Sequence, residues 1–204
     1  MRSYSLLLAS AGIAALASGA ALNCGAGDCA PAAWDSRLLG WFASASTPVF
    51  GAMFSAVTWL GSLWLLLPAA LVVVIGLVMH GRTRDALRFA MAFGGSALLA
   101  YVAKFLIGRE RPPSGELLVA MPADPSYPSG HAMQITAFVL AAVWLLMPRS
   151  QRGRWFAAAL MLIALVGASR LYLQVHFPSD VVVGTVAASL WVLAVMLWKK
   201  PSHA

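Results

Sequence analysis

Apolar residues occur along this chain in six long runs, which short polar segments separate. A helix needs about 20 consecutive apolar residues to cross the hydrocarbon core of a bilayer, and most of the runs approach or exceed that length. The runs therefore predict an all-α membrane protein, a six-transmembrane-helix bundle in one domain over residues 1–204. The expected spans are residues 5–22, 50–79, 86–107, 131–147, 155–173 and 180–198.

Two of these runs allow more than one interpretation. The first follows Arg2 and reads as a spanning helix or as a signal peptide, with cleavage sequences at Ala15–Ala17 and Ser18–Ala20; we expect it to be retained. The second extends from Pro48 to Met79, which is long for one span, and contains Gly61 and Pro68 in its interior. We expect it to be tilted or to enter the membrane several residues inside the run.

The segment from residue 23 to residue 47 is polar enough to leave the bilayer. It holds the two cysteines of the chain, Cys24 and Cys29, which are either joined in a small disulfide or free thiols. Its apolar residues would form one face of a short helix lying in the membrane interface, and a loop with aromatic anchors is the alternative. These apolar residues are Trp34, Leu38, Leu39, Trp41 and Phe42.

Composition agrees with a membrane protein. Hydrophobic residues make up 61% of the chain and charged residues 10%, and the mean hydropathy is +0.81. Soluble domains average about 45–50% apolar and about 25% charged residues, and the spans leave no room for a separate soluble domain. The net charge of +7 does not indicate nucleic acid, because the basic residues are scattered between apolar runs rather than clustered in a stripe.

The basic residues set the expected orientation. With six spans, the segments that carry them fall on one side of the membrane, which the positive-inside rule makes the cytoplasmic side. Residues 23–47, 108–130 and 174–179 then lie outside, and cleavage of the first span would leave the orientation of the others unchanged. The basic residues in question are Arg2, Arg82, Arg84, Arg88, Arg149, Arg152, Arg154, Lys199 and Lys200.

Several polar residues fall at the outer ends of the spans, where an uncompensated charge is costly. Lys104 and Arg111 lie at the outer end of the third span and Arg170 at the outer end of the fifth, while the fourth and sixth spans begin at Ser129–His131 and Pro178–Asp180. Helix N-termini present unpaired backbone N–H groups and a positive dipole end, both of which suit a phosphate group. Lys104 and Arg111, seven residues apart, would share one helical face if the helix continued between them.

Simpler roles are open for some of these residues. Arg109 and Glu110 are expected to form a solvated pair rather than to bind a ligand, and Asp180 could merely complement the dipole of its helix. His80 and His203 fall on the cytoplasmic side, where we expect them to be solvated. The case for a site rests on the combination of residues.

Three motifs in this region resemble those of a known family. They are Lys104-x6-Arg111-Pro112, Pro128-Ser129-Gly130-His131 and Ser169-Arg170-x5-His176-x3-Asp180. In this order they resemble the three-part signature of the type 2 phosphatidic acid phosphatase superfamily. That superfamily includes membrane lipid phosphate phosphatases and, on soluble helical folds, bacterial acid phosphatases and vanadium haloperoxidases. The six-span layout is similar to the membrane branch over the whole chain.

The resemblance implies a role for each motif residue. His176 would be the nucleophile that takes the phosphoryl group, Asp180 would hold its imidazole in the reactive tautomer, and His131 would protonate the leaving group. The residues that would bind the phosphate oxygens are Lys104, Arg111, Ser129, Gly130 and Arg170.

The same chemistry is coherent without the family. A neutral imidazole whose other nitrogen donates to a carboxylate is an activated and aligned nucleophile. Three cations around the phosphate supply the electrostatic stabilisation that phosphoryl transfer chiefly needs. No cofactor or metal is expected, because Asp180 has no carboxylate cluster beside it on that face to hold a divalent ion, and we expect activity in EDTA.

The sequence thus predicts a phosphatase of the cytoplasmic (inner) membrane, acting on a lipid phosphate or diphosphate at the outer, periplasmic face through a phosphohistidine. The resemblance implies undecaprenyl diphosphate, phosphatidylglycerophosphate, phosphatidate or lipid A phosphates as substrates, and the short chain favours undecaprenyl diphosphate or a broad range. One rival is an anion transporter, which would carry its charges near the membrane midplane. Another is a vanadate haloperoxidase, for which a lipid-facing site gives no reason.

Overall fold

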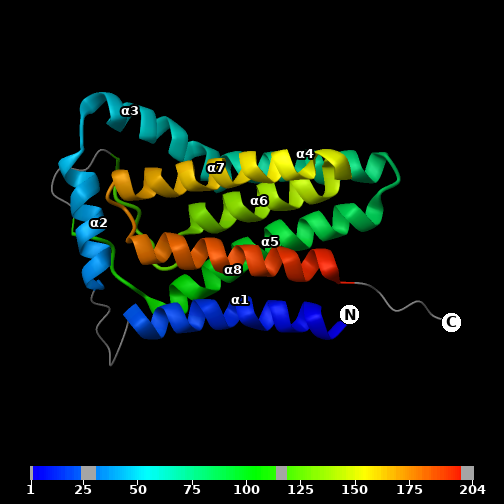
Figure 1. Cartoon of the computed structure of the whole chain (residues 1–204), viewed down its shortest axis with the longest axis horizontal. Helices are drawn as coiled ribbons and strands as arrows, with labels where there is room; N and C mark the ends of the chain where they lie inside the picture. The colour runs from blue at the N-terminus through cyan, green and yellow to red at the C-terminus, as the bar shows by residue number, and fades with distance from the viewer. Residues whose placement is uncertain (1, 24–30, 114–118, 199–204) are drawn as a thin grey trace.

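The computed structural model describes residues 2–23, 31–113 and 119–198, which form helices joined by short connections (Figure 1). Over these residues the predicted all-α fold is confirmed. The helices are α1 Arg2–Asn23, α2 Ala33–Ser44, α3 Pro48–Val57, α4 Leu63–Met79, α5 Thr83–Ile107, α6 Gly130–Leu146, α7 Arg152–Tyr172 and α8 Pro178–Leu197, with 3-10 turns η1 Thr58–Gly61 and η2 Arg149–Gln151.

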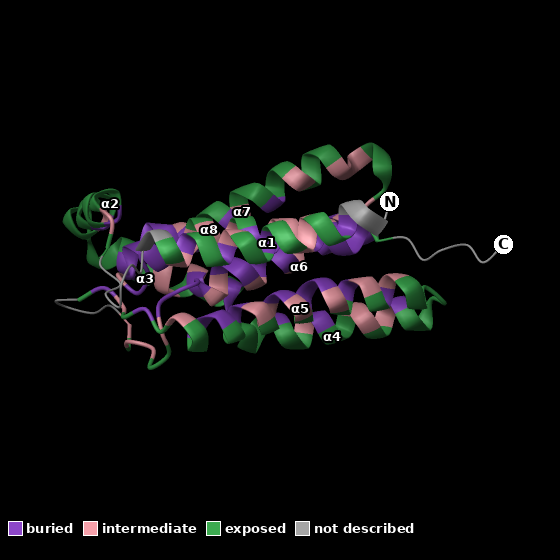
Figure 2. Cartoon of the chain, turned by 90° about the horizontal axis from the view of Figure 1, so that it is seen from below, coloured by how far each residue is buried: buried purple, intermediate pink, exposed green. Residues whose placement is uncertain are grey.

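Helices α6 and α8 hold the bundle together. α6 packs against α5, α7 and α8, and α8 also packs along α1 and α5; Figures 1 and 2 show α1, α5, α6 and α8 running lengthwise. Between α5 and α6 the ring of Phe138 meets Phe89 and Phe93 edge to face, with centroids 5.4 and 5.9 Å apart. This is the geometry that aromatic pairs prefer, and it fixes the two helices side by side.

A glycine lets α5 and α8 approach closely. A Cβ atom on Gly95 would lie 2.5 Å from the indole ring of Trp191. The Nε1 of Trp191 in turn donates to the backbone oxygen of Met91 at 3.0 Å. Gly95 thus permits the close packing of α5 against α8.

The long second run is not one continuous helix. It divides into α3, the turn η1 and α4, and the division falls at Ser62, whose backbone is extended (φ −73°, ψ 137°) and whose hydroxyl accepts from Trp64 N at 3.3 Å. Gly61 lies tightly against α7 and α6, since a Cβ there would be 2.6 Å from Val166 Cγ1. The apolar helix α4 therefore begins well inside the run, at Leu63, and α3 lies at an angle to it (Figure 1).

The segment before α3 contains the predicted short helix, α2, which lies across the end of the bundle in Figure 1. Its predicted apolar face is divided. Leu39 is buried with Leu171 and Phe177, and Phe42 packs on this cluster, whereas Trp34, Leu38 and Trp41 are exposed. Cys24 and Cys29 lie outside the described residues, as do Lys199, Lys200 and His203.

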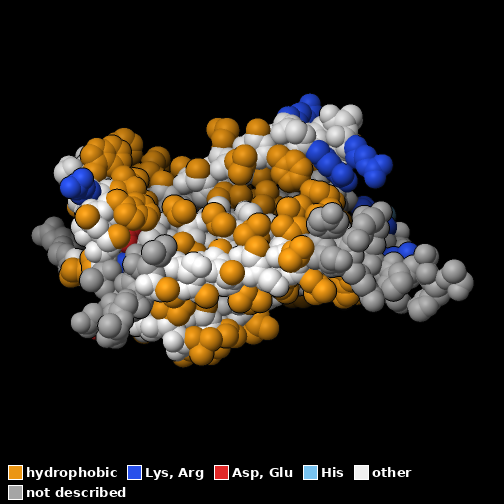
Figure 3. Space-filling model, turned by 60° about the horizontal axis from the view of Figure 1, so that its bottom comes forward, with side chains coloured by type: hydrophobic (Ala, Val, Ile, Leu, Met, Phe, Trp, Pro, Cys, Tyr) orange, Lys and Arg blue, Asp and Glu red, His pale blue; other side chains and the backbone are white. Residues whose placement is uncertain are grey.

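The protein is a multi-pass membrane protein. Four segments are long and apolar enough to cross a bilayer, namely Pro48–Met79, Thr83–Ile107, Arg149–Tyr172 and Pro178–Leu197, and the apolar helices Ser5–Ala21 and Gly130–Leu146 are shorter. Large apolar side chains lie on the surface along the length of the bundle (Figure 3). A soluble protein seldom exposes so much contiguous apolar surface. Six crossings remain a prediction.

The basic connections gather at one end of the bundle. The α4–α5 and α6–α7 connections and the start of α1 lie together at the right of Figure 1, and the Arg82 guanidinium donates to Leu145 O at 2.6 Å across the two connections. The connections that carry the motif residues lie at the opposite end. The fold thus separates the basic end from the motif end.

Candidate active site

The motif residues converge at the end of the bundle opposite the basic connections. Lys104 lies in the last turn of α5 and Arg170 in that of α7, while Ser129 caps α6 and Asp180 lies in the first turn of α8. The backbone N of Ser129 donates to Asp180 O at 3.1 Å, which holds the starts of α6 and α8 together. A Cβ atom on Gly130 would lie 3.8 Å from Lys104 Cε, so the start of α6 lies beside the lysine side chain.

His176 is almost fully buried between a carboxylate and a cation. Its Nδ1 lies 3.6 Å from Asp180 Oδ2, which is longer than a hydrogen bond, and its Nε2 lies 3.3 Å from Arg111 Nη1. Burial, and then the charges of Arg111, Arg170 and Lys104, hold the pKa of His176 well below its ordinary value. The imidazole is therefore neutral at neutral pH and retains a nitrogen lone pair.

The carboxylate of Asp180 is held by three donors. Arg109 Nη1 donates to Oδ1 at 2.6 Å, the backbone N of Phe177 donates to Oδ2 at 2.9 Å, and the hydroxyl of Ser126 also donates to Oδ2. The Phe177 contact caps the N-terminus of α8. The Asp180 carboxylate thus caps the N-terminus of α8 and at the same time faces the imidazole of His176.

Arg109 is not the solvated residue that its sequence position beside Glu110 predicts. Its side chain is fully buried, its Nη2 lies 3.1 Å from Asp35 Oδ2, and its guanidinium stacks 4.2 Å from the centroid of the Phe177 ring. Asp35, also fully buried, accepts from the backbone N and hydroxyl of Ser179 at 2.7 and 2.6 Å. The prediction that Arg109 is solvated is wrong, because the carboxylates of Asp35 and Asp180, from different helices, neutralise this cation inside the protein.

The condition for a shared helical face of Lys104 and Arg111, a helix that continues between them, is not met. α5 ends at Ile107, and Gly108 adopts the left-handed conformation (φ 64°) that terminates helices. The two cations nevertheless meet, because both bind the carboxylate of Asp124, with Lys104 Nζ 2.9 Å from Oδ2 and Arg111 Nη2 2.8 Å from Oδ1.

Asp124 is a charged neighbour of the site that the motifs do not include. Burial would raise its pKa, but the hydrogen bond and charge of Lys104 and the charge of Arg111 outweigh that effect and lower the pKa to about 2. Backbone acceptors hold the two cations as well, since Lys104 donates to Pro125 O and Arg111 donates to Val175 O and to Asp124 O.

The turn η1 supports the remaining two motif residues. Arg170 is buried, and its Nη1 donates to Thr58 Oγ1, while its Nε is buried without a hydrogen-bond partner among the described residues. Gly61 lies at the other end of the same turn. A Cβ atom built on Gly61 would lie 3.2 Å from both Cβ and O of His131. Arg170 therefore has donor capacity left for a ligand, and His131 rests directly on the turn.

Sequence reasoning missed Asp35, Arg109 and Asp124 as members of this region. One available signal is that Arg109 lies on the side of the membrane where basic flanks are disfavoured, as Lys104 does. Another is that Asp35 is an acidic residue within an otherwise apolar helical face. Both signals point to pairing inside the protein, but neither identifies the partner.

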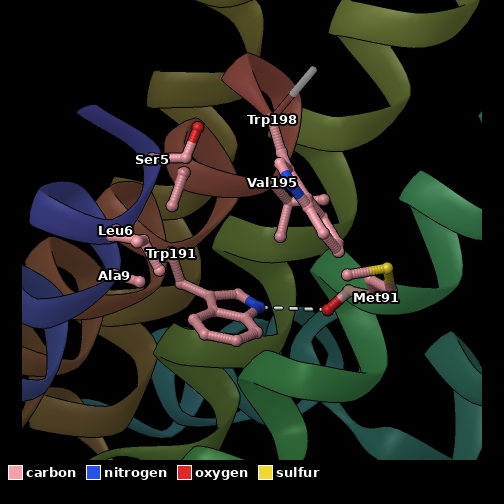
Figure 4. Close-up of a pocket in the computed structure, with 8 residues that line it drawn as sticks. Ser5, Leu6, Ala9, Met91, Trp191, Val195 and Trp198 are labelled. Carbon is pink, nitrogen blue, oxygen red and sulfur yellow. Dashed lines mark hydrogen bonds between the residues drawn. The ribbon is translucent and has the colours of Figure 1, made fainter. Parts of the chain in front are cut away.

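A prominent apolar pocket lies elsewhere. It has a volume of about 390 Å³ and lies between the start of α1, the start of α5 and the end of α8, where Trp191 and Trp198 form part of its wall (Figure 4). Its lining residues include no acidic or basic side chain, and the hydroxyl of Ser5 has no base among them to activate it. The residues are Ser5, Leu6, Ala9, Met91, Trp191, Ala194, Val195 and Trp198.

Comparison with known proteins connects this chain to an enzyme family. The family model described as PAP2 superfamily matches residues 85–203, more than half of the chain. Phosphatidylglycerophosphatase B of Bacillus subtilis (strain 168) is 31% identical over 143 residues, which cover 67% of this chain and 69% of that protein. An undecaprenyl-diphosphatase of Sulfolobus acidocaldarius is 34% identical over 122 residues, which cover 57% of this chain and 56% of that protein.

Solved structures share the fold. The crystal structure of a transmembrane PAP2 type phosphatidylglycerolphosphate phosphatase from Bacillus subtilis superposes with a TM-score of 0.77 at 26% identity, covering 94% of this chain and 93% of that one. The crystal structure of Aquifex aeolicus LpxE superposes with a TM-score of 0.66 at 22% identity, covering 82% of this chain and 97% of that one. The second likeness concerns the fold alone.

Proposed function

This chain belongs to the PAP2 superfamily of membrane lipid phosphatases, and we propose that it hydrolyses a lipid phosphate or diphosphate through a phosphohistidine intermediate. The observation that carries the proposal is the orientation of His176, whose Nδ1 faces Asp180 while its Nε2 lies beside Arg111. A nucleophile presented to a cation in this way is aimed at the place where a phosphate group would bind.

In the first step His176 Nε2 attacks phosphorus, a P–N bond forms, and the bond from phosphorus to the leaving oxygen of the lipid breaks. His131 protonates that oxygen as it leaves. In the second step water attacks phosphorus, His131 takes its proton, and the P–N bond breaks to release inorganic phosphate. His131 is close enough to His176 to influence it electrostatically, and Asp180 stabilises the positive charge that develops on the imidazole.

The phosphate oxygens bind to Lys104, Arg111 and Arg170, with the hydroxyl of Ser129 and the N–H of Gly130 at the N-terminus of α6 completing the site. These groups are fixed before substrate arrives, which is the condition for electrostatic stabilisation of a phosphoryl transition state. The buried Nε of Arg170, which has no partner among the described residues, supports this assignment.

The separation of charges along the bundle supports an outward-facing site. The basic connections lie at the opposite end from the site (Figure 1), and the positive-inside rule then favours the outer, periplasmic face of the cytoplasmic membrane for the site. A lipid can then present its head group to the site while its tail stays in the bilayer. Undecaprenyl diphosphate is the preferred candidate, with phosphatidylglycerophosphate, phosphatidate and lipid A phosphates as alternatives.

The anion-transporter alternative is less well supported. It requires charged groups near the middle of the membrane, whereas the buried Asp, Lys, Arg and His side chains among the described residues all lie at the motif end of the bundle. They are Asp35, Lys104, Arg109, Arg170, His176 and Asp180.

The test is phosphate release by purified protein in detergent with EDTA, over a panel of these four lipids. We expect wild type to release phosphate and His176→Ala to release none. His80→Ala is the matched control, because His80 is exposed at the basic end and its loss should leave the rate unchanged. Equal release by wild type and His176→Ala would refute the histidine mechanism, and release from no lipid would refute the phosphatase proposal.

A further inference from the structure

The carboxylate of Asp124 forms ion pairs with two cations of the site, Lys104 and Arg111. Its Oδ2 lies 2.9 Å from Lys104 Nζ and its Oδ1 lies 2.8 Å from Arg111 Nη2. Each oxygen of one anion thus meets a different cation, which is how two oxygens of a phosphate group would be bound. In the free protein the chain itself supplies the anion for this pair.

The Asp124 side chain is much more exposed to solvent than the two cations with which it pairs. The side chains of Lys104 and Arg111 are only 9% and 7% exposed, whereas that of Asp124 is 48% exposed. Rotation of the Asp124 side chain would carry its carboxylate into water without opening the protein. Lys104 and Arg111 would remain oriented, because Pro125 O holds the first and Val175 O and Asp124 O hold the second.

Building on the proposed function, we propose that Asp124 sets the affinity that a phosphate group needs in order to occupy the site, because the substrate must displace its carboxylate. It acts as a tethered competitor at the Lys104–Arg111 pair. The residue makes no covalent contribution and takes no part in proton transfer.

The consequence is a threshold of affinity, which strongly bound anions pass and weakly bound anions do not. A phosphomonoester carries about −1.5 to −2 at pH 7, and a terminal phosphate of a diphosphate is similarly charged, so either has an electrostatic advantage over a single carboxylate. A phosphodiester carries one negative charge and has no such advantage. Because most bilayer phospholipids are phosphodiesters, Asp124 keeps their head groups from occupying the site. Its low pKa keeps it ionised throughout the range in which an enzyme would be assayed.

Equilibrium binding of two soluble probes tests the proposal. Inorganic phosphate at about pH 8, where it carries close to two charges, and dimethyl phosphate, a monoanion, are titrated into wild type, Asp124→Asn and Asp124→Glu in detergent. Asp85→Asn is the matched control, because Asp85 also pairs with two basic residues, Arg82 at 2.8 Å and Arg88 at 3.6 Å, on α5 near the basic end.

We expect Asp124→Asn to bind inorganic phosphate about three- to thirtyfold more tightly, the change that loss of two partly exposed ion pairs implies. Dimethyl phosphate should gain by about the same factor, because a tethered competitor lowers equally the affinity of every anion that must displace it. Asp124→Glu and Asp85→Asn should bind as wild type does. Weaker or unchanged phosphate binding by Asp124→Asn would overturn the proposal, since it would mean that the carboxylate positions the cations or has no effect on them.

The same proteins separate this inference from the proposed function. Probe binding needs no turnover, so it reports on Asp124 even if no lipid is hydrolysed. Loss of hydrolysis across the lipid panel would refute the phosphatase assignment, whereas normal hydrolysis with unchanged probe binding in Asp124→Asn would refute only the competitor role.

Discussion

Asp35 and Arg109 form an ion pair with an N–O distance of 3.1 Å, although 74 residues separate them and both side chains are fully buried. The same guanidinium lies 2.6 Å from the carboxylate of Asp180. One cation therefore compensates two buried carboxylates, one from α2 and one from α8. Asp180 owes its fixed position in part to a residue on α2, which no catalytic motif contains.

The first prediction concerns this pair. Arg109→Met should destabilise the fold by about 3–5 kcal/mol, because it leaves two buried carboxylates without their cation, and it should abolish hydrolysis by freeing Asp180. The measurement is the free energy of unfolding by denaturant in detergent. Arg37→Met is the control, since Arg37 is exposed on α2 and its replacement should change little. Equal stability of the two variants would show that the buried network contributes nothing.

The sequence was sufficient to predict which motif residues lie at the same end of the bundle, but not which other residues pair with them. Alternation of apolar runs and basic connections determines which helix ends meet, so the positions of Lys104, Arg170 and Asp180 at one end could be predicted. Which of Arg109 and Arg111 faces inward could not be predicted. That choice depends on the left-handed turn at Gly108, which ends the helical periodicity, and on an acidic partner from α2.

The burial of His176 predicts a pH dependence of stability. Because burial and the neighbouring cations lower its pKa in the folded state, only the unfolded state takes up a proton as the pH falls through about 6.5. Protonation of His176 therefore stabilises the unfolded state below that pH, and the free energy of unfolding should fall between about pH 7 and pH 5. The thermal midpoint in detergent should fall less with acidification in His176→Gln than in wild type.

His80→Gln provides the comparison for that experiment, because His80 is exposed and its loss should leave the wild-type pH profile unchanged. If wild type and His176→Gln lose stability in parallel on acidification, then His176 is protonated in the folded protein and the argument for a neutral nucleophile fails.

A third prediction concerns metal removal. Lys104, Arg111 and Arg170 provide the positive charge that a divalent ion provides in other phosphatases, so hydrolysis should proceed at an unchanged rate after dialysis against EDTA. The described residues include no cluster of three or more His, Cys, Asp or Glu side chains arranged to hold a metal ion. A rate that disappears in EDTA and returns with Mg²⁺ or Mn²⁺ would contradict the prediction.

The last prediction concerns the turn η1, which supports both His131 and Arg170. A Cβ atom on Gly61 would lie 2.6 Å from Val166 Cγ1 and 3.2 Å from Cβ and O of His131. The stiff valine and the helix backbone cannot yield easily, so Gly61→Ala should move the turn, displace His131 and disturb the bond from Arg170 to Thr58.

Misplacement of reacting groups by about 1 Å can cost about a hundredfold in rate, so we expect kcat of Gly61→Ala to fall about ten- to hundredfold. Gly76→Ala is the matched control, because a Cβ atom there meets nothing within 4 Å and alanine favours the helix. Steady-state kinetics on one lipid phosphate would compare the two variants. Since the substituted position is not in contact with phosphate, the loss should appear mainly in kcat. Equal kcat values for the two alanine variants would mean that the tight contact of η1 with α6 does not position His131.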